Sequence, residues 1–272
     1  MKPGSKDLAT LAIDIGGTQI KAAVLDPSGR MVVPEIRLRT PSHATPHAML
    51  RAIRDLAGQL PSFDRISVGF PGYVTDGRVV TAPNLGTAAW HDFRLAETLG
   101  KNLGKPVRVL NDADVQGLGA IKGRGLECVL TLGTGVGSAL FKSGMLFPHL
   151  ELGQHPIHKD KTYDQYLGSA ALTKKGIAKW NKRVQRAIGI VHTLVNYDWL
   201  YLGGGNAAAI RFELPPEVKI VPNSAGVTGG IRLWDAALDD VFGNGEPMRS
   251  SRFQSARSEE ATNGRRRRLL SA

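Results

Sequence analysis

Apolar residues along the chain gather in short runs, and most of these runs end at glycines, prolines or polar residues. Short runs rich in β-branched residues are typical of buried strands, whereas longer stretches with apolar residues three and four apart indicate amphipathic helices. Strands are expected at 8–15, 20–25, 31–38, 66–70, 106–110, 198–202 and 220–222. Helices are expected at 45–60, 92–103, 115–122, 170–196 with a break near Gly176, and 226–242.

A glycine turn joins the first two expected strands at Gly16 and Gly17. Asp14 ends the first strand, and Thr18 and Lys21 follow the turn with a hydroxyl and a positive charge. Because glycine lacks Cβ and tolerates positive φ, a phosphate can approach the backbone N–H groups closely. The second strand is expected to return antiparallel, so the stretch differs from a P-loop, whose glycines open a helix. A plain hairpin without a ligand explains this stretch equally well when it is taken alone.

The same design recurs twice, which makes a plain hairpin a weaker explanation. A second apolar strand runs into Gly133, Thr134, Gly135 and Gly137, and a third run ends at Gly203, Gly204, Gly205 and Asn206. Three glycine turns at strand ends suggest a nucleotide held between two halves of the protein.

Two further polar positions follow apolar runs. Asn111 and Asp112 come directly after the strand expected at 106–110, and Asn84 follows Pro83. A carboxylate at Asp112 could accept a proton from a weakly nucleophilic hydroxyl. Helix capping by Asn111 or Asp112, and an Asx turn at Asn84, are the alternatives that the local sequence favours.

The amino-acid composition is typical of an ordinary globular chain. Hydrophobic residues make up 42% and charged residues 22% of the 272 residues, enough for two lobes with separate cores. Cys128 is the single cysteine, which excludes an intramolecular disulfide and favours a reducing compartment. No run approaches the ~18 apolar residues of a membrane span, and residues 1–7 lack the apolar part of a signal peptide. We therefore expect a cytoplasmic protein with no membrane partner.

A formal net charge of +11 predicts a polyanionic partner. From Glu246 onward, seven basic and three acidic residues in an apolar-poor stretch predict a disordered basic tail, which leaves +7 on the remaining chain. A basic face with spacings of four, three and four is expected on the helix at 170–196, formed by Lys175, Lys179, Lys182 and Arg186. Its buried side is expected at Ile177, Val184, Ile188, Val191 and Val195. Such spacing alone usually marks a solvated helix face, and a track for a phosphate chain is the alternative.

These motifs, in this order, resemble the ROK family of sugar kinases within the actin-like ATPase superfamily, over residues 8–243. The stretches 179–183 and 200–206 resemble its polyphosphate/ATP-dependent glucokinase (glucomannokinase) branch. The resemblance implies an α/β fold of two actin-like, ribonuclease-H-like lobes around a central cleft. A small N-terminal lobe would comprise 1–110, with the last helix, about 232–243, packing back on it. The large lobe would comprise 111–231, and the disordered tail 244–272.

The resemblance also implies a catalytic base and a set of sugar contacts. Asp112 would take the proton of the sugar hydroxyl, and sugar contacts would come from Asn84, Asn111, Asp112, Glu151, Gln154, His155 and Asp164. In the family pattern Glu-x-Gly-His, the histidine position holds Gln154 here and a histidine follows it, so Gln154 and His155 both remain candidates. Asp164 stands where the family has a glutamate, which predicts a less selective sugar pocket.

The donor phosphates would bind at the glycine turns. The residues implied are Asp14, Gly16, Gly17, Thr18, Lys21, Thr134, Gly135, Gly137, Gly203, Gly204, Gly205 and Asn206. Mg²⁺ would be held by Asp14 through water, and the donor would be ATP or inorganic polyphosphate lying on the basic face. Many relatives carry a cysteine-rich zinc loop that this chain lacks. No zinc is therefore expected, although His149, His155 and His158 lie near Glu151 in the sequence.

Three functional classes follow from the resemblance. A kinase for the 6-hydroxyl of glucose, and also of mannose, agrees with all motifs. A strictly ATP-dependent glucokinase is the alternative within this class. A phosphate-chain hydrolase or filament-forming ATPase of the same superfamily is the second class, and the family's DNA-binding repressors are the third. The family's DNA-binding repressors need an N-terminal helix-turn-helix, and only seven residues precede the first strand, so no nucleic-acid partner is expected. The sequence leaves the oligomeric state open, a homodimer included.

Overall fold

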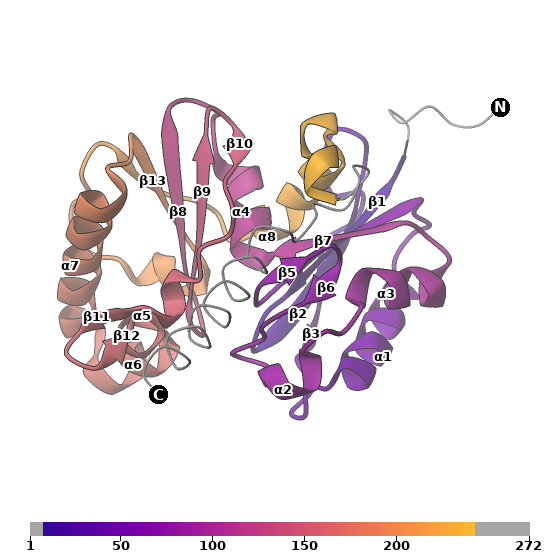
Figure 1. Cartoon of the computed structure of the whole chain (residues 1–272), viewed down its shortest axis with the longest axis horizontal. Coiled ribbons are helices and arrows are strands. Elements are labelled where there is room, and N and C mark those ends of the chain that lie inside the picture. The colour runs from indigo at the N-terminus through magenta and orange to yellow at the C-terminus, as the bar shows by residue number, and fades with distance from the viewer. Residues whose placement is uncertain (1–7, 243–272) are drawn as a thin grey trace, which may run out of the picture.

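The computed structural model describes residues 8–242, and the basic tail expected at 244–272 lies outside these residues. Two five-stranded sheets lie side by side, each covered by helices on its outer side (Figure 1). Each sheet has its own cluster of buried apolar residues, so the chain forms two α/β lobes. The two-lobed α/β architecture expected from the sequence is confirmed.

The first sheet has the strand order β3-β2-β1-β4-β7. Its strands are β1 (Thr10–Ile15), β2 (Gln19–Leu25), β3 (Ile36–Arg39), β4 (Arg65–Phe70) and β7 (Val107–Asn111). β1 to β3 form an antiparallel meander, whereas β4 and β7 run parallel to β1. Strands β1, β4 and β7 therefore end at the same edge of the sheet, which brings Asp14 and Asn111 to that edge.

Three helices and a small hairpin complete the first lobe. The helices are α1 (Pro46–Ala57), α2 (Thr87–Trp90) and α3 (Leu95–Leu103), and the hairpin consists of β5 (Val74–Thr75) and β6 (Arg78–Val79). Thr45 caps α1 by accepting a hydrogen bond from the N–H of Ala48, and Pro46 occupies the first turn, where no N–H is needed. The third strand is shorter than expected, because the segment from Val32 to Glu35 leaves the sheet after a single bridge at Met31.

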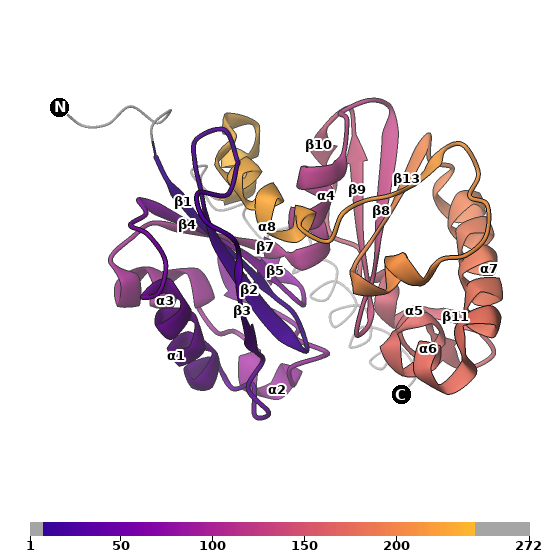
Figure 2. The ribbon, with the colours of Figure 1, turned by 180° about the vertical axis from the view of Figure 1, so that it is seen from behind.

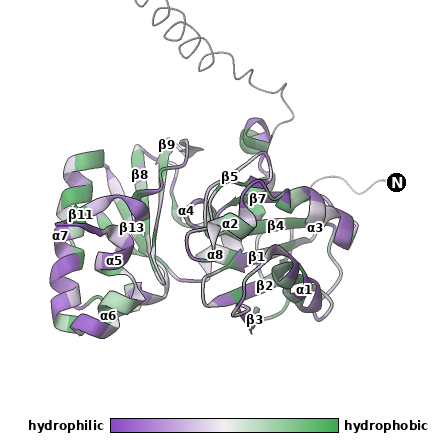
Figure 3. Cartoon of the chain, turned by 60° about the horizontal axis from the view of Figure 1, so that its bottom comes forward, coloured by the Kyte–Doolittle hydropathy of each residue, from purple (hydrophilic) through white to green (hydrophobic). Residues whose placement is uncertain are grey.

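The second sheet has the order β10-β9-β8-β13-β14. Its strands are β8 (Leu126–Leu132), β9 (Val136–Lys142), β10 (Met145–Leu146), β13 (Trp199–Gly203) and β14 (Val218–Ile220). Between β10 and β13 the chain forms η1 (Leu152–Gln154), β11 (Pro156–His158), β12 (Lys161–Thr162), α5 (Tyr163–Leu167), α6 (Ser169–Lys175) and α7 (Ile177–Val195). A short 3₁₀ helix, η2 (Gly205–Ala209), follows β13. Hydrophilic and hydrophobic residues alternate along α7, as expected of a helix with one buried side (Figure 3).

Helix α4 (Asp112–Ala120) lies between the two sheets (Figures 1 and 2). Its glycines allow close packing on both sides. A Cβ at Gly117 would lie 2.5 Å from the ring of Phe141, and a Cβ at Gly119 would lie 2.8 Å from the carbonyl oxygen of Ala225. Helix α4 is therefore held closely between β9 on one side and the returning C-terminal segment on the other.

The last segment returns to the first sheet, but it is not the continuous helix that the pattern predicted at 226–242. It consists of α8 (Ala225–Thr228) and two 3₁₀ helices, η3 (Gly229–Trp234) and η4 (Ala236–Phe242). Gly229 and Gly230 disfavour a long helix, and a Cβ at Gly229 would lie 2.0 Å from the carbonyl oxygen of Val115. Ser67 Oγ donates to the Gly230 carbonyl at 2.7 Å and accepts from Trp234 Nε1 at 2.9 Å.

Within residues 8–242, we find no helix whose length and hydropathy would allow it to span a membrane.

Candidate active site

A cleft of about 290 Å³ opens between the two lobes. It gathers most of the residues that the sequence predicted: Asp14, Gly16, Gly17, Thr18, Lys21, Asn84, Asn111, Asp112, Thr134, Gly135, Gly137, Glu151, Gln154, Asp164, Gly204, Gly205 and Asn206. Six predicted residues are not among those that line it: Gly203, His155, Lys175, Lys179, Lys182 and Arg186. Residues far apart in the sequence thus meet in one cavity, and the basic face lies outside it.

The first and second glycine turns face each other across the cleft. Thr18 Oγ1 and Thr134 Oγ1 are 3.1 Å apart, although 116 positions separate them in the sequence. A Cβ at Gly16 would lie 2.8 Å from the carbonyl oxygen of Gln19. The same oxygen accepts a hydrogen bond from the Gly16 N–H within the turn. Neither Gly16 nor Gly17 has a positive φ, so the glycine requirement at Gly16 comes from space rather than from backbone conformation, contrary to our expectation.

The third glycine run lies against the second. Gly204 has a φ of 80°, and a Cβ there would lie 2.4 Å from the carbonyl oxygen of Leu132. Asn206 Nδ2 donates to the Gly133 carbonyl at 2.9 Å and contacts Ser169 Oγ at 3.1 Å. The Asn206 amide therefore fixes the third run to the second turn. Ser169, which sequence reasoning missed, completes this contact from the start of α6.

Asp14 and Lys21 form an ion pair of 2.9 Å at the edge of the first sheet. They are direct neighbours in the β1–β2 register, so the hairpin itself brings them together. Gly226 of α8 lies close by, since a Cβ there would be 2.9 Å from Asp14 Oδ2. Gly226 and Asn223 line the cleft from the returning C-terminal segment, and the local sequence around them gave no signal of this role.

Asp112 occupies the start of α4 at the floor of the cleft. Burial raises the pKa of its carboxyl group to about 8, the charge of Asp14 adds to the rise, and a hydrogen bond from the Ala113 N–H opposes it. That hydrogen bond measures 2.9 Å. A carboxylate with a pKa near neutrality is suited to accept a proton from a substrate hydroxyl.

Asn111 is the N-cap of α4, as the local sequence favoured. Its Oδ1 accepts a hydrogen bond from Ala113 N at 2.8 Å, and its Nδ2 donates to the Gly72 carbonyl at 3.1 Å. The cap links α4 to the loop after β4, so Asn111 fixes the position of the neighbouring Asp112.

Gln154 and Asp164 form a pair on the second lobe. Gln154 Nε2 donates to Asp164 Oδ2 at 2.9 Å, and the Val136 N–H donates to Asp164 Oδ1 at 2.6 Å. Burial raises the pKa of Asp164, and these two hydrogen bonds oppose the rise. His155 is exposed and does not line the cleft, so of the two candidates for the family's histidine position Gln154 is the one at the site.

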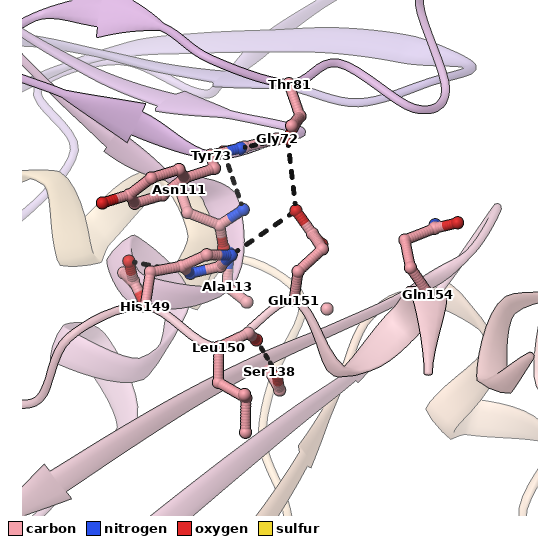
Figure 4. A network of polar contacts seen from close by, with 12 residues as sticks. Gly72, Tyr73, Thr81, Asn111, Ala113, Ser138, His149, Leu150, Glu151 and Gln154 are labelled. Carbon is pink, nitrogen blue, oxygen red and sulfur yellow. Dashed lines mark hydrogen bonds and ion pairs between the residues drawn. The ribbon is translucent and has the colours of Figure 1, made fainter. Parts of the chain in front are cut away.

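Glu151 reaches into the cleft from the loop before η1. Its Oε2 lies 3.5 Å from Thr81 Oγ1 in the first lobe and 3.6 Å from Nε2 of His149 (Figure 4). His149 is therefore a neighbour of the site that sequence reasoning considered only as a zinc ligand. No group of three or more His, Cys, Asp or Glu side chains suited to a metal occurs in the part of the chain that the structure describes.

Gln116 and Thr131 also line the cleft and were missed. Gln116 lies one helical turn after Asp112, and the i, i+4 spacing on α4 was a signal that could have found it. Thr131 Oγ1 accepts from the Gly137 N–H at 3.0 Å and so shapes the second glycine turn.

The basic face on α7 differs in two respects from the expectation. Gly176, with a φ of 73°, separates Lys175 on α6 from the other three basic residues on α7. Ile177 was expected to be buried but is 45% exposed, whereas Val184, Ile188 and Val191 are buried as expected.

Sequence comparison places these features in a known family. The sequence model of the ROK family matches residues 10–150. The polyphosphate glucokinase of Mycobacterium tuberculosis (strain ATCC 25618 / H37Rv) is 33% identical over 234 residues, which cover 80% of this chain and 88% of the relative. The chain belongs to the ROK family.

Solved structures of ROK proteins have the same architecture. The inorganic polyphosphate/ATP-glucomannokinase from Arthrobacter sp. strain KM superposes with a TM-score of 0.76 and 29% identity, covering 83% of this ROK chain and 98% of that chain. The ROK glucokinase from Streptomyces griseus, solved with glucose and AMPPNP, gives a TM-score of 0.70 at 20% identity, with 83% and 98% of the chains covered. At that identity the second comparison supports the fold alone.

Proposed function

We propose that this ROK protein is a hexose kinase that transfers a phosphoryl group from inorganic polyphosphate or ATP to the 6-hydroxyl of glucose, and also of mannose. The observation that carries the proposal is that two Gly/Thr turns face each other beside Asp112 in one cleft. Polar side chains at the same cleft, among them Glu151, Asp164 and Asn84, are suited to hold a sugar. The single cysteine favours a cytoplasmic location.

Each group of residues at the cleft would have its own task in the reaction. Asp112 accepts the proton of the 6-hydroxyl while the hydroxyl oxygen of the sugar attacks the terminal phosphorus of the donor. The P–O bond to the rest of the donor breaks, and the remaining phosphate chain or ADP leaves with the bonding electrons. The facing hydroxyls of Thr18 and Thr134, with the neighbouring backbone N–H groups, hold the donor phosphates. Glu151 and Asp164 accept hydrogen bonds from sugar hydroxyls and orient the 6-hydroxyl toward Asp112. Closure of the lobes excludes water, which would otherwise act as the acceptor.

The residues around Asp14 fit a magnesium ion bound through water. Mg²⁺ keeps several waters and takes one or two carboxylates together with substrate phosphates, so a cluster of three protein ligands is not required. Asp14 lines the cleft, and its charge contributes to the raised pKa of Asp112 after burial, so a cation beside the two carboxyl groups would relieve their repulsion. A bound cation would neutralise the donor phosphates. Asp14 would hold it, and Lys21 keeps the Asp14 carboxylate in place.

Polyphosphate as a donor is supported by the relatives and by a basic surface on the second lobe. Lys179, Lys182 and Arg186 are exposed on α7. Burial lowers the pKa of His158, and the charges of Arg186, Lys159, Arg183 and Lys161 lower it further, so the β11–β12 turn adds two lysines near this face. Helix α7 follows α6, whose first residue, Ser169, lines the cleft. A long phosphate chain extending from the cleft would meet this surface, whereas ATP would not need it.

A strictly ATP-dependent kinase and a phosphate-chain hydrolase make different predictions. Steady-state kinetics with glucose, mannose and fructose, each against ATP and polyphosphate, separates the three. The proposed kinase consumes both donors only when a hexose is present. Use of ATP alone would remove the polyphosphate part of the proposal, and donor consumption without sugar would favour the hydrolase.

A further inference from the structure

His149 was not among the predicted site residues, but its side chain lies between two carboxylates. Its side chain is only 7% exposed, its Nδ1 is 3.5 Å from Asp114 Oδ2, and its Nε2 is 3.6 Å from Glu151 Oε2. The imidazole ring stacks on the ring of Tyr73, with centroids 5.5 Å apart and planes inclined by 11° (Figure 4). Both ring nitrogens therefore face carboxylates while one ring face is covered.

The neighbours of His149 come from three separate parts of the fold. Asp114 lies in the first turn of α4, Glu151 lies in the cleft, and Tyr73 belongs to the first lobe, just before β5. His149 therefore joins the helix that carries Asp112 to the loop that carries Glu151, and it contacts the opposite lobe through Tyr73.

This arrangement requires a charged imidazole. A neutral imidazole donates from one nitrogen only, so two carboxylates facing both nitrogens call for two N–H groups. Burial disfavours the charged ring, but the neighbouring carboxylates of Asp114 and Glu151 outweigh it and raise the pKa of His149 to about 9. Asp114 is 5% exposed. Among residues 8–242, Asp114 Oδ1 and both ring nitrogens of His149 have no hydrogen-bond partner, so the two contacts of His149 are ion pairs. Burial raises the pKa of Asp114, and His149 counters that rise. We therefore assign the shared proton to His149.

We propose that His149 is a positioning residue that holds the Glu151 carboxylate toward the sugar end of the cleft by bridging it to Asp114. The inference rests on the proposed function, because it treats Glu151 as a sugar ligand. Glu151 has only two polar side-chain contacts in the described structure, Thr81 and His149, and both involve Oε2. Its Oε1 is left free to accept a hydrogen bond from a sugar hydroxyl.

The bridge stabilises the site because it places a positive charge beside acidic side chains that repel one another. Glu151, Asp114 and Asp112 are close enough for the charges of Glu151 and Asp114 to raise the pKa of Asp112. Without a cation between them, the Glu151 carboxylate would rotate away from the other two into solvent. The sugar would then lose one oriented acceptor, while the glycine turns that hold the donor would be unchanged. The effect should therefore appear in the Michaelis constant for the sugar.

The first test is the substitution His149→Gln, which keeps a planar side chain and an N–H donor but removes the charge. We expect the KM for glucose to rise about ten-fold, while the KM for the donor and kcat change less than about three-fold. His47→Gln on the exposed surface of α1 is the matched control and should leave all three constants unchanged. Equal losses for sugar and donor would indicate general damage to the fold and would overturn the proposal.

A double-mutant cycle separates positioning from a structural role. If His149 acts through Glu151, then His149→Gln should change the KM for glucose less than two-fold when Glu151 is already Gln. Effects that add fully in the double variant would contradict the proposal, even if each single variant loses affinity.

An NMR titration of the His149 imidazole gives a readout that does not depend on activity. We expect it to titrate near pH 9 in the wild-type protein and nearer its ordinary value in Asp114→Asn. A titration near pH 6.5 in the wild type would show that the bridge does not form and would overturn the inference. If the bridge forms but the wild-type protein phosphorylates no hexose, the proposed function fails, and the sugar-positioning role fails with it.

Discussion

At the scale of single residues, the site depends on how burial and neighbouring charges set the protonation of three carboxyl groups. Asp112, Asp114 and Asp164 all have a pKa above the usual range, and burial is the largest cause in each case. Their partners differ: a backbone N–H for Asp112, His149 for Asp114, and Val136 with Gln154 for Asp164. Only the Asp112 carboxylate lacks a side-chain partner, which leaves it available for a substrate proton.

Asp112→Asn tests this assignment directly. The variant should bind glucose within a few-fold of the wild type but lose ~10²-fold or more in kcat, the range expected for a positioned base. Because burial and Asp14 disfavour the charged carboxylate, its melting temperature should be equal to or higher than that of the wild type. Turnover close to the wild-type rate would remove Asp112 from the role of base.

Asp164→Glu should change sugar selectivity, if the short side chain makes the pocket permissive. Asp164 lies against two glycines, since a Cβ at either Gly135 or Gly153 would be 2.7 Å from its carboxylate oxygen. A glutamate therefore has to extend into the cleft, where it would contact the sugar more closely. We expect the ratio of kcat/KM for glucose over mannose to increase, and an unchanged ratio would contradict this explanation.

His149 should also make stability depend on pH. Its pKa rises from 6.5 to about 9 on folding, so its contribution is fully present below pH 6.5 and is lost as pH increases through 9. The full contribution is about 3 kcal/mol, since each pKa unit corresponds to about 1.4 kcal/mol. Asp114 and Glu151 are the acidic groups that face the ring, and Tyr73 covers it.

Urea unfolding at pH 6, 7.5 and 9 measures this contribution. The raised pKa of Asp112, about 8, also makes the folded protein more stable at lower pH. The contribution of His149 is therefore measured as the difference between wild type and His149→Gln. The difference in unfolding free energy should shrink as the pH rises to 9. A difference that stays constant across the three pH values would show that the charge of His149 does not stabilise the fold.

At the scale of elements, the buried central strands were predictable, whereas the edge strand β3 and the short helices after Asn223 were not. Runs such as Leu11–Ile15 and Ile66–Phe70 are buried along nearly their whole length, so the apolar pattern identified β1 and β4 within one or two residues. The segment after Asn223 failed as a continuous helix because Gly229 and Gly230 pack against backbone and side chains of other elements. Such contacts are set by the tertiary fold, and local sequence does not encode them.

The basic face of the second lobe provides a prediction at this scale. Reversing Lys179 and Lys182 to Glu should raise the KM for long polyphosphate and leave that for ATP nearly unchanged. The KM for polyphosphate should also rise steeply with salt in the wild type, because bound phosphates release counterions, and less steeply in the variant. Arg51→Glu with Arg54→Glu on α1 is the matched control, since these exposed residues have the same spacing on the other lobe. Equal effects on both donors would contradict a dedicated track.

At the scale of the whole molecule, the cleft exists because two sheets and α4 bring distant turns together. The Thr18–Thr134 contact and the approach of Gly226 to Asp14 join segments more than 100 residues apart. The repeated glycine turns indicated the donor side of the cleft, whereas the sugar side, with Asp112, was predicted through the family resemblance. Gln116 was missed although its i, i+4 spacing from Asp112 on α4 could have found it. Ser169 and His149 were missed because their roles depend on partners that only the folded chain places beside them.

The identity of the phosphoryl acceptor tests the account most directly. The measurement is ³¹P NMR of the purified protein with Mg²⁺ and either polyphosphate or ATP, in the presence and absence of glucose. The account predicts that glucose 6-phosphate accumulates with each donor and that donor consumption without glucose is at least ~10²-fold slower, because a closed cleft excludes water. Release of inorganic phosphate at the same rate with and without sugar would contradict it.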